Sequence, residues 1–171
     1  EKICHQNQIA YREFNSQLIN PDLVRNNSGL PFKVFTPYSK KIRSLLTSDI
    51  LRETPAPLKQ KNRTLDQDEV PQFQDAFDQE LNFSFDDFPV TETSASQKLD
   101  DFIDSSIQNY KELRDIPSLS ATSNLSSSFA IGLISSKQAI NHVLKSLPDE
   151  NGTGQFAWIT EIIWREFYKY I

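Results

Sequence analysis

The sequence predicts a mainly α-helical chain, and its second half carries the strongest signals. Two helix-start patterns, in which a serine precedes a glutamine by three residues, begin at Ser94 and Ser135. Apolar residues follow each of them at intervals of three and four, the spacing of one helix face. The same spacing recurs over 155–171. These observations predict helices across most of 94–171.

Composition limits the remaining possibilities. Only 37% of the 171 residues are hydrophobic, against about 45–50% in an ordinary globular domain, so part of the chain is expected to lie outside a core. The single cysteine, Cys4, has only His5 beside it as a possible ligand, which argues against a disulfide scaffold and a zinc module, and we expect no metal site. The sequence contains no methionine, and we expect it to be an internal fragment of a longer protein.

Residues 1–34 have the pattern expected at the end of a packed domain. A short apolar run over 9–19 predicts one strand, which the turn at 20–22 would end. An extended segment at 30–35 comes next. The Thr-Pro dipeptide after it predicts a helix cap and a short helix over 38–47.

Residues 48–93 change character. Prolines interrupt this stretch, and its charges separate into a basic block followed by an acidic one. The composition predicts a connector lying over a surface, anchored by Phe73, Phe77, Phe83, Phe85 and Phe88.

The helical region is predicted to hold three helices. The first would run from Ser94 to near Arg114, the second would start at Ser135, and the third would occupy 155–171. Apolar runs nowhere approach the roughly 20 residues of a membrane-spanning helix, so no membrane association is expected.

A hydroxyl-rich loop separates the first two helices. Residues 122–126 precede an apolar segment, and hydroxyls together with free N–H groups at a helix start suit a phosphate. The alternative is an ordinary serine-rich turn with a helix cap, and spacing alone favours that alternative.

The third helix carries a carboxyl group among large aromatic residues. Trp158, Glu161 and Trp164 share one face, and burial there would favour the neutral form of the acid. One interpretation is a pocket for a flat, polar-edged ligand such as a nucleobase. The other is a core helix in which Glu161 pairs with Arg165 at the i, i+4 spacing. The residues themselves leave both open.

The order and spacing of five motifs resemble the DNA photolyase and cryptochrome family, most closely class I cyclobutane pyrimidine dimer photolyases. The motifs are LPFKVFTPY at 30–38, the Tyr-x-x-x-Arg-Asp-x-Pro pattern at 110–117, Thr-Ser-x-Leu-Ser at 122–126, Gly-x-Ile-Ser at 132–135 and EIIWREFY at 161–168.

The resemblance implies an α/β, Rossmann-like antenna domain followed by an all-α FAD-binding domain, both incomplete here. Residues 1–34 would end the antenna domain, 35–93 would form the connector, and 94–171 would begin the FAD domain.

The resemblance also implies roles for single residues. Glu161 and Trp164 would face a flipped pyrimidine dimer and be the catalytic pair. The implied FAD contacts are Tyr110, Thr122, Ser123, Asn124, Leu125, Ser126 and Trp158. The implied DNA-side residues are Arg114, Glu161, Ile162, Ile163, Trp164, Arg165, Glu166, Phe167 and Tyr168.

The implied activity is blue-light-driven DNA repair, in which an electron passes from reduced FAD to the dimer and returns after the ring opens. This is the chemistry of a pyrimidine dimer photo-lyase, a carbon–carbon lyase acting on UV-damaged DNA as a cytoplasmic monomer. The alternative is a cryptochrome, an FAD-containing photoreceptor without repair activity. A folate or deazaflavin antenna is possible but cannot be assigned. The fragment alone is not expected to repair DNA.

Overall fold

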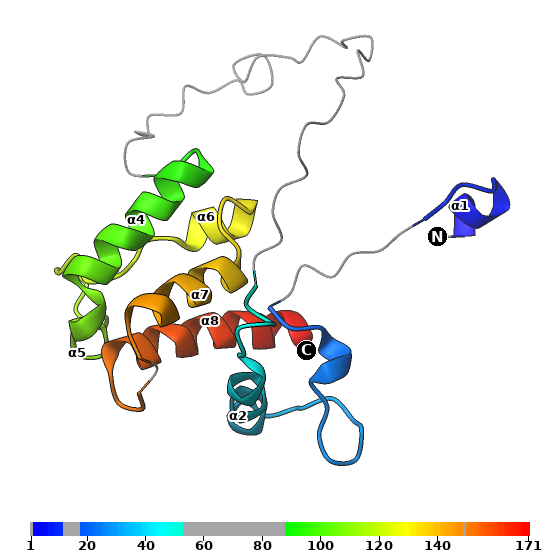
Figure 1. Ribbon diagram of the computed structural model, residues 1–171, viewed down its shortest axis with the longest axis horizontal. Helices are drawn as coiled ribbons and strands as arrows, with labels where there is room; N and C mark the ends of the chain where they lie inside the picture. Colours follow the sequence, from blue (N-terminus) through cyan, green and yellow to red (C-terminus); the bar gives the residue numbers. More distant parts are fainter. Residues whose placement is uncertain (1, 12–17, 53–87, 149) are drawn as a thin grey trace, which may run out of the picture.

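The computed structural model describes residues 2–11, 18–52, 88–148 and 150–171, and the architecture in these ranges is helical (Figure 1). Within them, the β pairing consists of one isolated bridge between Arg25 and Pro31. No helix in these ranges is long and apolar enough to cross a membrane. The elements are α1 (Lys2–Gln6), η1 (Pro21–Leu23), α2 (Phe35–Leu45), α4 (Glu92–Ser105), η3 (Ile107–Asn109), α5 (Tyr110–Leu113), α6 (Ser126–Ile131), α7 (Ser136–Ser146) and α8 (Gly154–Tyr170).

Helix α8 is the centre of the packing. It lies between α2 and α7 in Figure 1 and also contacts η3 and α5. Its first turn is capped by Thr153, whose hydroxyl accepts a hydrogen bond from the Phe156 amide. Its buried residues are Gly154, Gln155, Trp158, Ile159, Ile162, Ile163, Glu166 and Phe167.

One hydrophobic core joins the N-terminal segment to the helices that follow. Leu18, Val24 and Ile42 are almost fully buried and belong to the same cluster as Ile159 and Ile163 of α8. The buried residues of 18–51 therefore share one core with α8. The domain boundaries expected at residues 34 and 93 stay predictions.

The second and third predicted helices are found close to the expected positions. Ser135 and Gln138 form the predicted capping box at the start of α7, and α8 begins at Gly154, one residue before the expected start. The turn at 20–22 is η1, in which the Asn20 side chain accepts a hydrogen bond from the Asp22 amide.

Two predicted helix starts are wrong by a few residues. Helix α2 begins at Phe35 rather than Tyr38, and Pro37 lies inside its first turn. This is possible because the first-turn N–H groups have no partner within the helix, so proline removes no hydrogen bond there. The first predicted capping box also shifts, since Thr91 is the cap and Ser94 its third helical residue.

The prediction of one continuous helix from Ser94 to near Arg114 is also wrong. Helix α4 ends at Ser105, and the short elements η3 and α5 follow as separate elements. The Ser105 hydroxyl donates to the Asp101 carbonyl at 2.6 Å, a side-chain bond that competes with the helical ladder.

Helix α1, whose residues are not buried, was not predicted. Most of the expected strand and most of the connector lie outside the described residues. Among the predicted anchors of the connector, Phe88 is described, and its side chain is half exposed.

A buried carboxylate holds three parts of the fold together. Glu166 is 3% exposed. It accepts hydrogen bonds from the Leu18 amide at 2.9 Å, from the Ser136 hydroxyl at 2.8 Å and from Arg165 Nη1 at 2.8 Å. A buried charge is tolerated only with such partners. Glu166 therefore fixes the N-terminal segment and the start of α7 against α8.

We expect Glu166→Gln to lower the free energy of unfolding by about 1.5–3 kcal/mol, because an amide NH2 would replace one acceptor of charge-assisted hydrogen bonds. Denaturant unfolding followed by tryptophan fluorescence measures the change. The exposed Glu112→Gln is the control and should change stability by less than about 0.5 kcal/mol. Equal effects of the two substitutions would contradict this role.

Helix α8 also makes a close backbone contact at its start. A Cβ atom on Gly154 would lie 1.9 Å from the Ile107 carbonyl oxygen and 2.6 Å from that of Gln108, so only glycine allows α8 to approach η3 this closely.

We expect Gly154→Ala to destabilise the fold by about 1–3 kcal/mol, as overpacking against backbone does. The sign is diagnostic, because helix propensity alone would make alanine stabilising by up to about 1 kcal/mol. A thermal or denaturant midpoint that rises in the variant would show that η3 does not pack against α8 in this way.

Candidate functional site

An ion pair between α5 and α8 lies at the centre of the candidate site. Arg114 directly follows α5, and its Nη1 donates to Oε1 of Glu161 on α8. Both side chains are partly exposed, 33% for Arg114 and 41% for Glu161. The alternative in which Glu161 pairs with Arg165 is therefore wrong. The carboxyl group that was expected to be buried among aromatic rings is instead partly exposed and paired with an arginine.

Tyr110 lies beside this ion pair. Its ring is buried, packs edge-on against Phe102 at 5.8 Å, and has the Arg114 guanidinium carbon 5.8 Å from its centroid. Burial raises the pKa of the Tyr110 hydroxyl, and the charge of Glu161 raises it further, while Arg114 acts in the opposite direction.

The hydroxyl-rich loop takes a tight conformation. Asn124 has a positive φ of 49°, which asparagine tolerates better than most residues. The Thr122 hydroxyl donates to the Asn124 side-chain oxygen at 3.1 Å, and both residues are exposed. Ser123 accepts a hydrogen bond from the Trp158 indole N–H at 3.3 Å. The loop is therefore attached to α8.

The start of α6 after this loop has polar groups without partners. Its cap residue, Leu125, offers no side-chain acceptor to the helix. The hydroxyl oxygens of Ser127 and Ser128 are buried and have no hydrogen-bond partner. Exposed hydroxyls, uncapped N–H groups and orphaned hydroxyls together have the donor chemistry that the phosphates of a nucleotide cofactor need.

A chain of aromatic rings connects the loop to the ion pair. Trp158 is 2% exposed, and its ring lies 5.7 Å from Phe102, which in turn contacts Tyr110. The structure therefore brings Tyr110, Trp158 and Ser123 of the predicted cofactor residues into one connected cluster. Trp158 is deeply buried, and the hydrogen bond from its indole N–H attaches it to the loop.

The predicted DNA-side residues separate into two groups. Ile162, Ile163, Glu166 and Phe167 are buried in the core of this structure. Arg114, Glu161, Trp164, Arg165 and Tyr168 reach the surface to different degrees, and Tyr168 is 68% exposed. Burial therefore gives the first group a packing role. A direct role on DNA stays a prediction for every residue in both groups.

Arg165 is held within the protein. Its guanidinium donates to the Phe129 carbonyl at 3.0 Å, to the Ser136 hydroxyl at 3.2 Å and to Glu166 at 2.8 Å. These bonds connect α6, α7 and α8 and leave little of its hydrogen-bonding capacity for a ligand.

A groove beside Glu161 contains residues that sequence reasoning missed. Lys111 lines it and donates to the Gly152 carbonyl at 3.2 Å. The sequence marked 147–152 only as a loop, because nothing local shows that it faces α5. The groove is lined by Lys111, Arg114, Asn151, Gly152, Thr153, Phe156, Ala157, Thr160 and Glu161.

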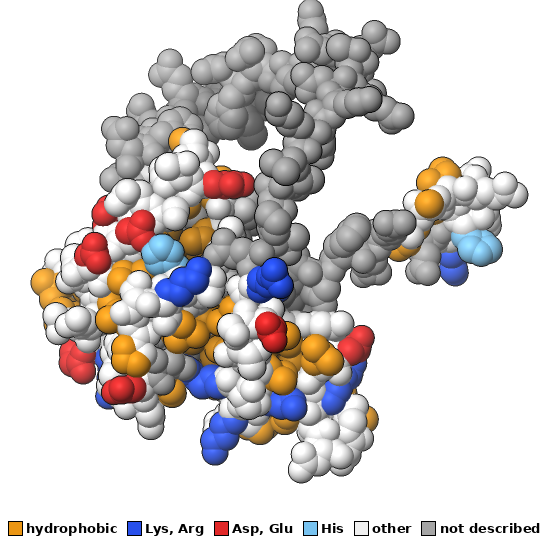
Figure 2. All heavy atoms as spheres, viewed as in Figure 1, with side chains coloured by type: hydrophobic (Ala, Val, Ile, Leu, Met, Phe, Trp, Pro, Cys, Tyr) orange, Lys and Arg blue, Asp and Glu red, His pale blue; other side chains and the backbone are white. Residues whose placement is uncertain are grey.

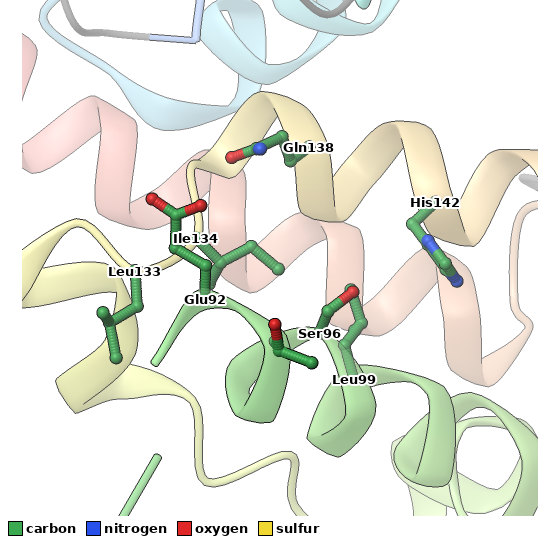
Figure 3. A pocket seen from close by; sticks show the side chains of 8 residues that line it. Glu92, Ser96, Leu99, Leu133, Ile134, Gln138 and His142 are labelled. Atoms are coloured by element: carbon green, nitrogen blue, oxygen red, sulfur yellow. The ribbon is translucent and has the colours of Figure 1, made fainter. Parts of the chain in front are cut away.

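A second hollow lies between α4 and α7 (Figure 3). Glu92 and Ser96 line it from α4, Gln138 and His142 from α7. The His142 Nε2 lies 2.5 Å from an Asp100 carboxylate oxygen, so this histidine joins two helices at the surface. The lining of this second hollow shares no residue with the groove at Glu161.

Within the described ranges, no group of three or more His, Cys, Asp or Glu residues could hold a metal ion.

Charge is unevenly distributed over the surface. On the face seen in Figure 2, acidic side chains gather over α4, whereas lysines and arginines gather over α2. The residues are Glu92, Asp100, Asp101 and Asp104 on α4, and Lys40, Lys41 and Arg43 on α2. The chain has a net charge of −5, yet its surface over α2 is locally basic.

Known proteins resemble this chain over nearly its whole length. The deoxyribodipyrimidine photo-lyase of Salmonella typhimurium is 32% identical over 163 residues, which cover 92% of this chain and 33% of that protein. The enzyme of the same name from Buchnera aphidicola (Acyrthosiphon pisum) is 35% identical, covering 86% of this chain and 30% of that protein. No family model matches the sequence.

A solved structure agrees with these relatives. A class III photolyase from Agrobacterium tumefaciens superposes with a TM-score of 0.78 at 26% sequence identity, covering 99% of this chain and 36% of that one. In sequence and in fold, this chain belongs with the DNA photolyases. It spans about a third of the length of these photolyases. The class I assignment stays a prediction, because the relatives' names carry no class and the solved structure is of class III.

The electrostatic arrangement of this candidate site is testable by titration. We expect Glu161→Gln to lower the pKa of Tyr110 relative to the unmodified protein, because a neighbouring negative charge that raises it is removed. Tyr38 is the internal control, since burial first and then Glu166 raise its pKa. NMR titration of 13C-labelled tyrosines measures both. A Tyr110 pKa unchanged by the substitution would contradict the proximity of the two groups.

Proposed function

We propose that the protein containing this chain is a light-dependent DNA repair enzyme that uses FAD to split cyclobutane pyrimidine dimers. One observation carries the proposal. A loop with phosphate-binding chemistry and the Arg114–Glu161 pair lie at two ends of one buried aromatic chain, on residues of the motifs that resemble those of photolyases. The names of the relatives support the same activity.

The hydroxyl-rich loop is the proposed holder of the FAD phosphates. Thr122, Asn124 and Ser126 present exposed polar side chains, and the start of α6 adds unpaired hydroxyls. Leu125 is buried and anchors the loop, while Ser123 attaches it to Trp158. Tyr110 would lie along the same cofactor. Bound FAD, when reduced, would supply the light-driven electron for ring opening.

Glu161 is proposed to bind the base edges of a flipped dimer. In the free protein it is held by Arg114, a cation that can also bind a DNA phosphate. Arrival of a DNA backbone therefore offers Arg114 another anionic partner and leaves Glu161 available for hydrogen bonds with the bases. The dimer itself is easier to extrude than an intact pair, because it stacks poorly.

Trp164 is proposed to pack on the dimer. It lies one helical turn after Glu161 on α8, so both project toward the same side. We further propose that the protein acts as a cytoplasmic monomer, with DNA as its macromolecular partner. A folate or deazaflavin antenna is compatible with the proposal and is not assigned.

The proposal predicts repair that depends on light. The product of the complete reading frame that encodes this chain is purified with its flavin, reduced, and mixed with an oligonucleotide containing one thymine cyclobutane dimer. We expect restored thymines under blue light and none in darkness. Flavin binding without dimer splitting would overturn the repair proposal and favour a cryptochrome.

The role of Glu161 predicts a loss of lesion recognition. We expect Glu161→Gln to weaken binding to the dimer-containing oligonucleotide by about tenfold, the size of one charge-assisted hydrogen bond, and to lower repair under light. Affinity for undamaged DNA should change little. Full affinity and full repair yield in the variant would show that neither the charge nor the ionisable proton is needed. Glu112→Gln, at an exposed position on α5, is the matched control.

A further inference from the structure

Trp164 is covered on one face by a residue from a distant part of the sequence. Phe35, the first residue of α2, stacks on it with ring centroids 3.5 Å apart and planes 6° apart. Phe35 also packs edge-on against Phe167 at 5.8 Å. The ring of Phe35 is therefore held by Phe167 as well as by Trp164.

Helix α2 is attached to α8 at a second point, which prevents Phe35 from moving independently. Arg43 donates to the Phe156 carbonyl at 3.0 Å and to the Thr160 hydroxyl at 2.8 Å, and its guanidinium carbon lies 3.7 Å from the Phe156 ring centroid. Ile42, which precedes Arg43 in the sequence, is buried in the core. Helix α2 therefore contacts α8 at two places, at Thr160 before Glu161 in the sequence and at Trp164 after it.

The accessible side of Trp164 carries a different kind of residue. Tyr168 stacks on Trp164 with centroids 5.6 Å apart and planes 24° apart. A ring that lies flat over the indole at 3.5 Å fills that face, so Tyr168 contacts Trp164 from the other side. Tyr168 is 68% exposed, and exposed side chains change rotamer readily. A flat ligand can displace Tyr168, whereas Phe35 is fixed.

We propose that Phe35 is a positioning residue for dimer recognition, which holds the indole of Trp164 at a fixed angle and leaves one side for the lesion. This inference rests on the proposed function. Its physical basis is preorganisation, because a large side chain that is already ordered loses less conformational freedom on binding.

The test uses the holoprotein from the complete reading frame and two variants, Phe35→Leu and Phe35→Met. Both remain apolar, and methionine keeps most of the volume, but neither offers a flat ring. We expect affinity for the dimer-containing oligonucleotide to fall by about three- to tenfold, the size of an aromatic pair, with FAD content and affinity for undamaged DNA unchanged. Phe35→Tyr should restore the affinity.

Two controls separate positioning from a general structural effect. Phe32→Leu removes a half-buried ring of the same segment, which contacts Tyr38 at 6.4 Å, and should leave dimer affinity unchanged. In a Trp164→Leu background, Phe35→Leu should cause no further loss, because the group it positions is gone.

The outcomes distinguish the two proposals. Wild-type protein that does not prefer the dimer over undamaged DNA would contradict the proposed function itself. Wild-type preference that persists in both Phe35 variants, or an equal further loss in the Trp164→Leu background, would overturn the positioning role while leaving the proposed function intact.

Discussion

The arrangement of this chain depends on the buried carboxylate of Glu166. Removing a charge from water is costly, and here three donors offset that cost: a backbone amide of the N-terminal segment, a hydroxyl at the start of α7 and a neighbouring arginine. A partner set that comes from three elements is satisfied in only one arrangement of those elements. Glu166 therefore specifies how α8 lies against the N-terminal segment and α7.

The position of Glu166 is transmitted to the site because α8 is a continuous helix. Glu161 and Trp164 lie within two turns of Glu166, so their places are set by helix geometry and not by a loop. At the other end, the contact at Gly154 fixes the distance between α8 and η3, and α5 with Arg114 continues from η3. The two partners of the ion pair are thus placed by one rigid helix and one backbone contact.

Local signals were predictable from the sequence, and long-range partners were not. The capping box at Ser135 and the apolar spacing of α7 and α8 are properties of a few neighbouring residues, and both were found as predicted. The partner of Glu161 was not predictable, because Arg165 has the favourable i, i+4 spacing while Arg114 is 47 residues away. The end of α4 at Ser105 was also missed, since a side-chain bond to the backbone leaves no mark in hydrophobic spacing.

The Arg114–Glu161 pair gives the proposed function a basis for selectivity. A ligand that supplies only a phosphate can engage Arg114 but breaks its ion pair with Glu161 beside Tyr110, which offsets part of the gain. A ligand that supplies only hydrogen-bond donors to Glu161 takes that carboxylate away from Arg114 and replaces it with no other anion. A flipped lesion on a DNA strand brings both at once and replaces the whole ion pair. Coupling the two residues therefore favours damaged DNA over either component alone, through the loss that partial ligands cause.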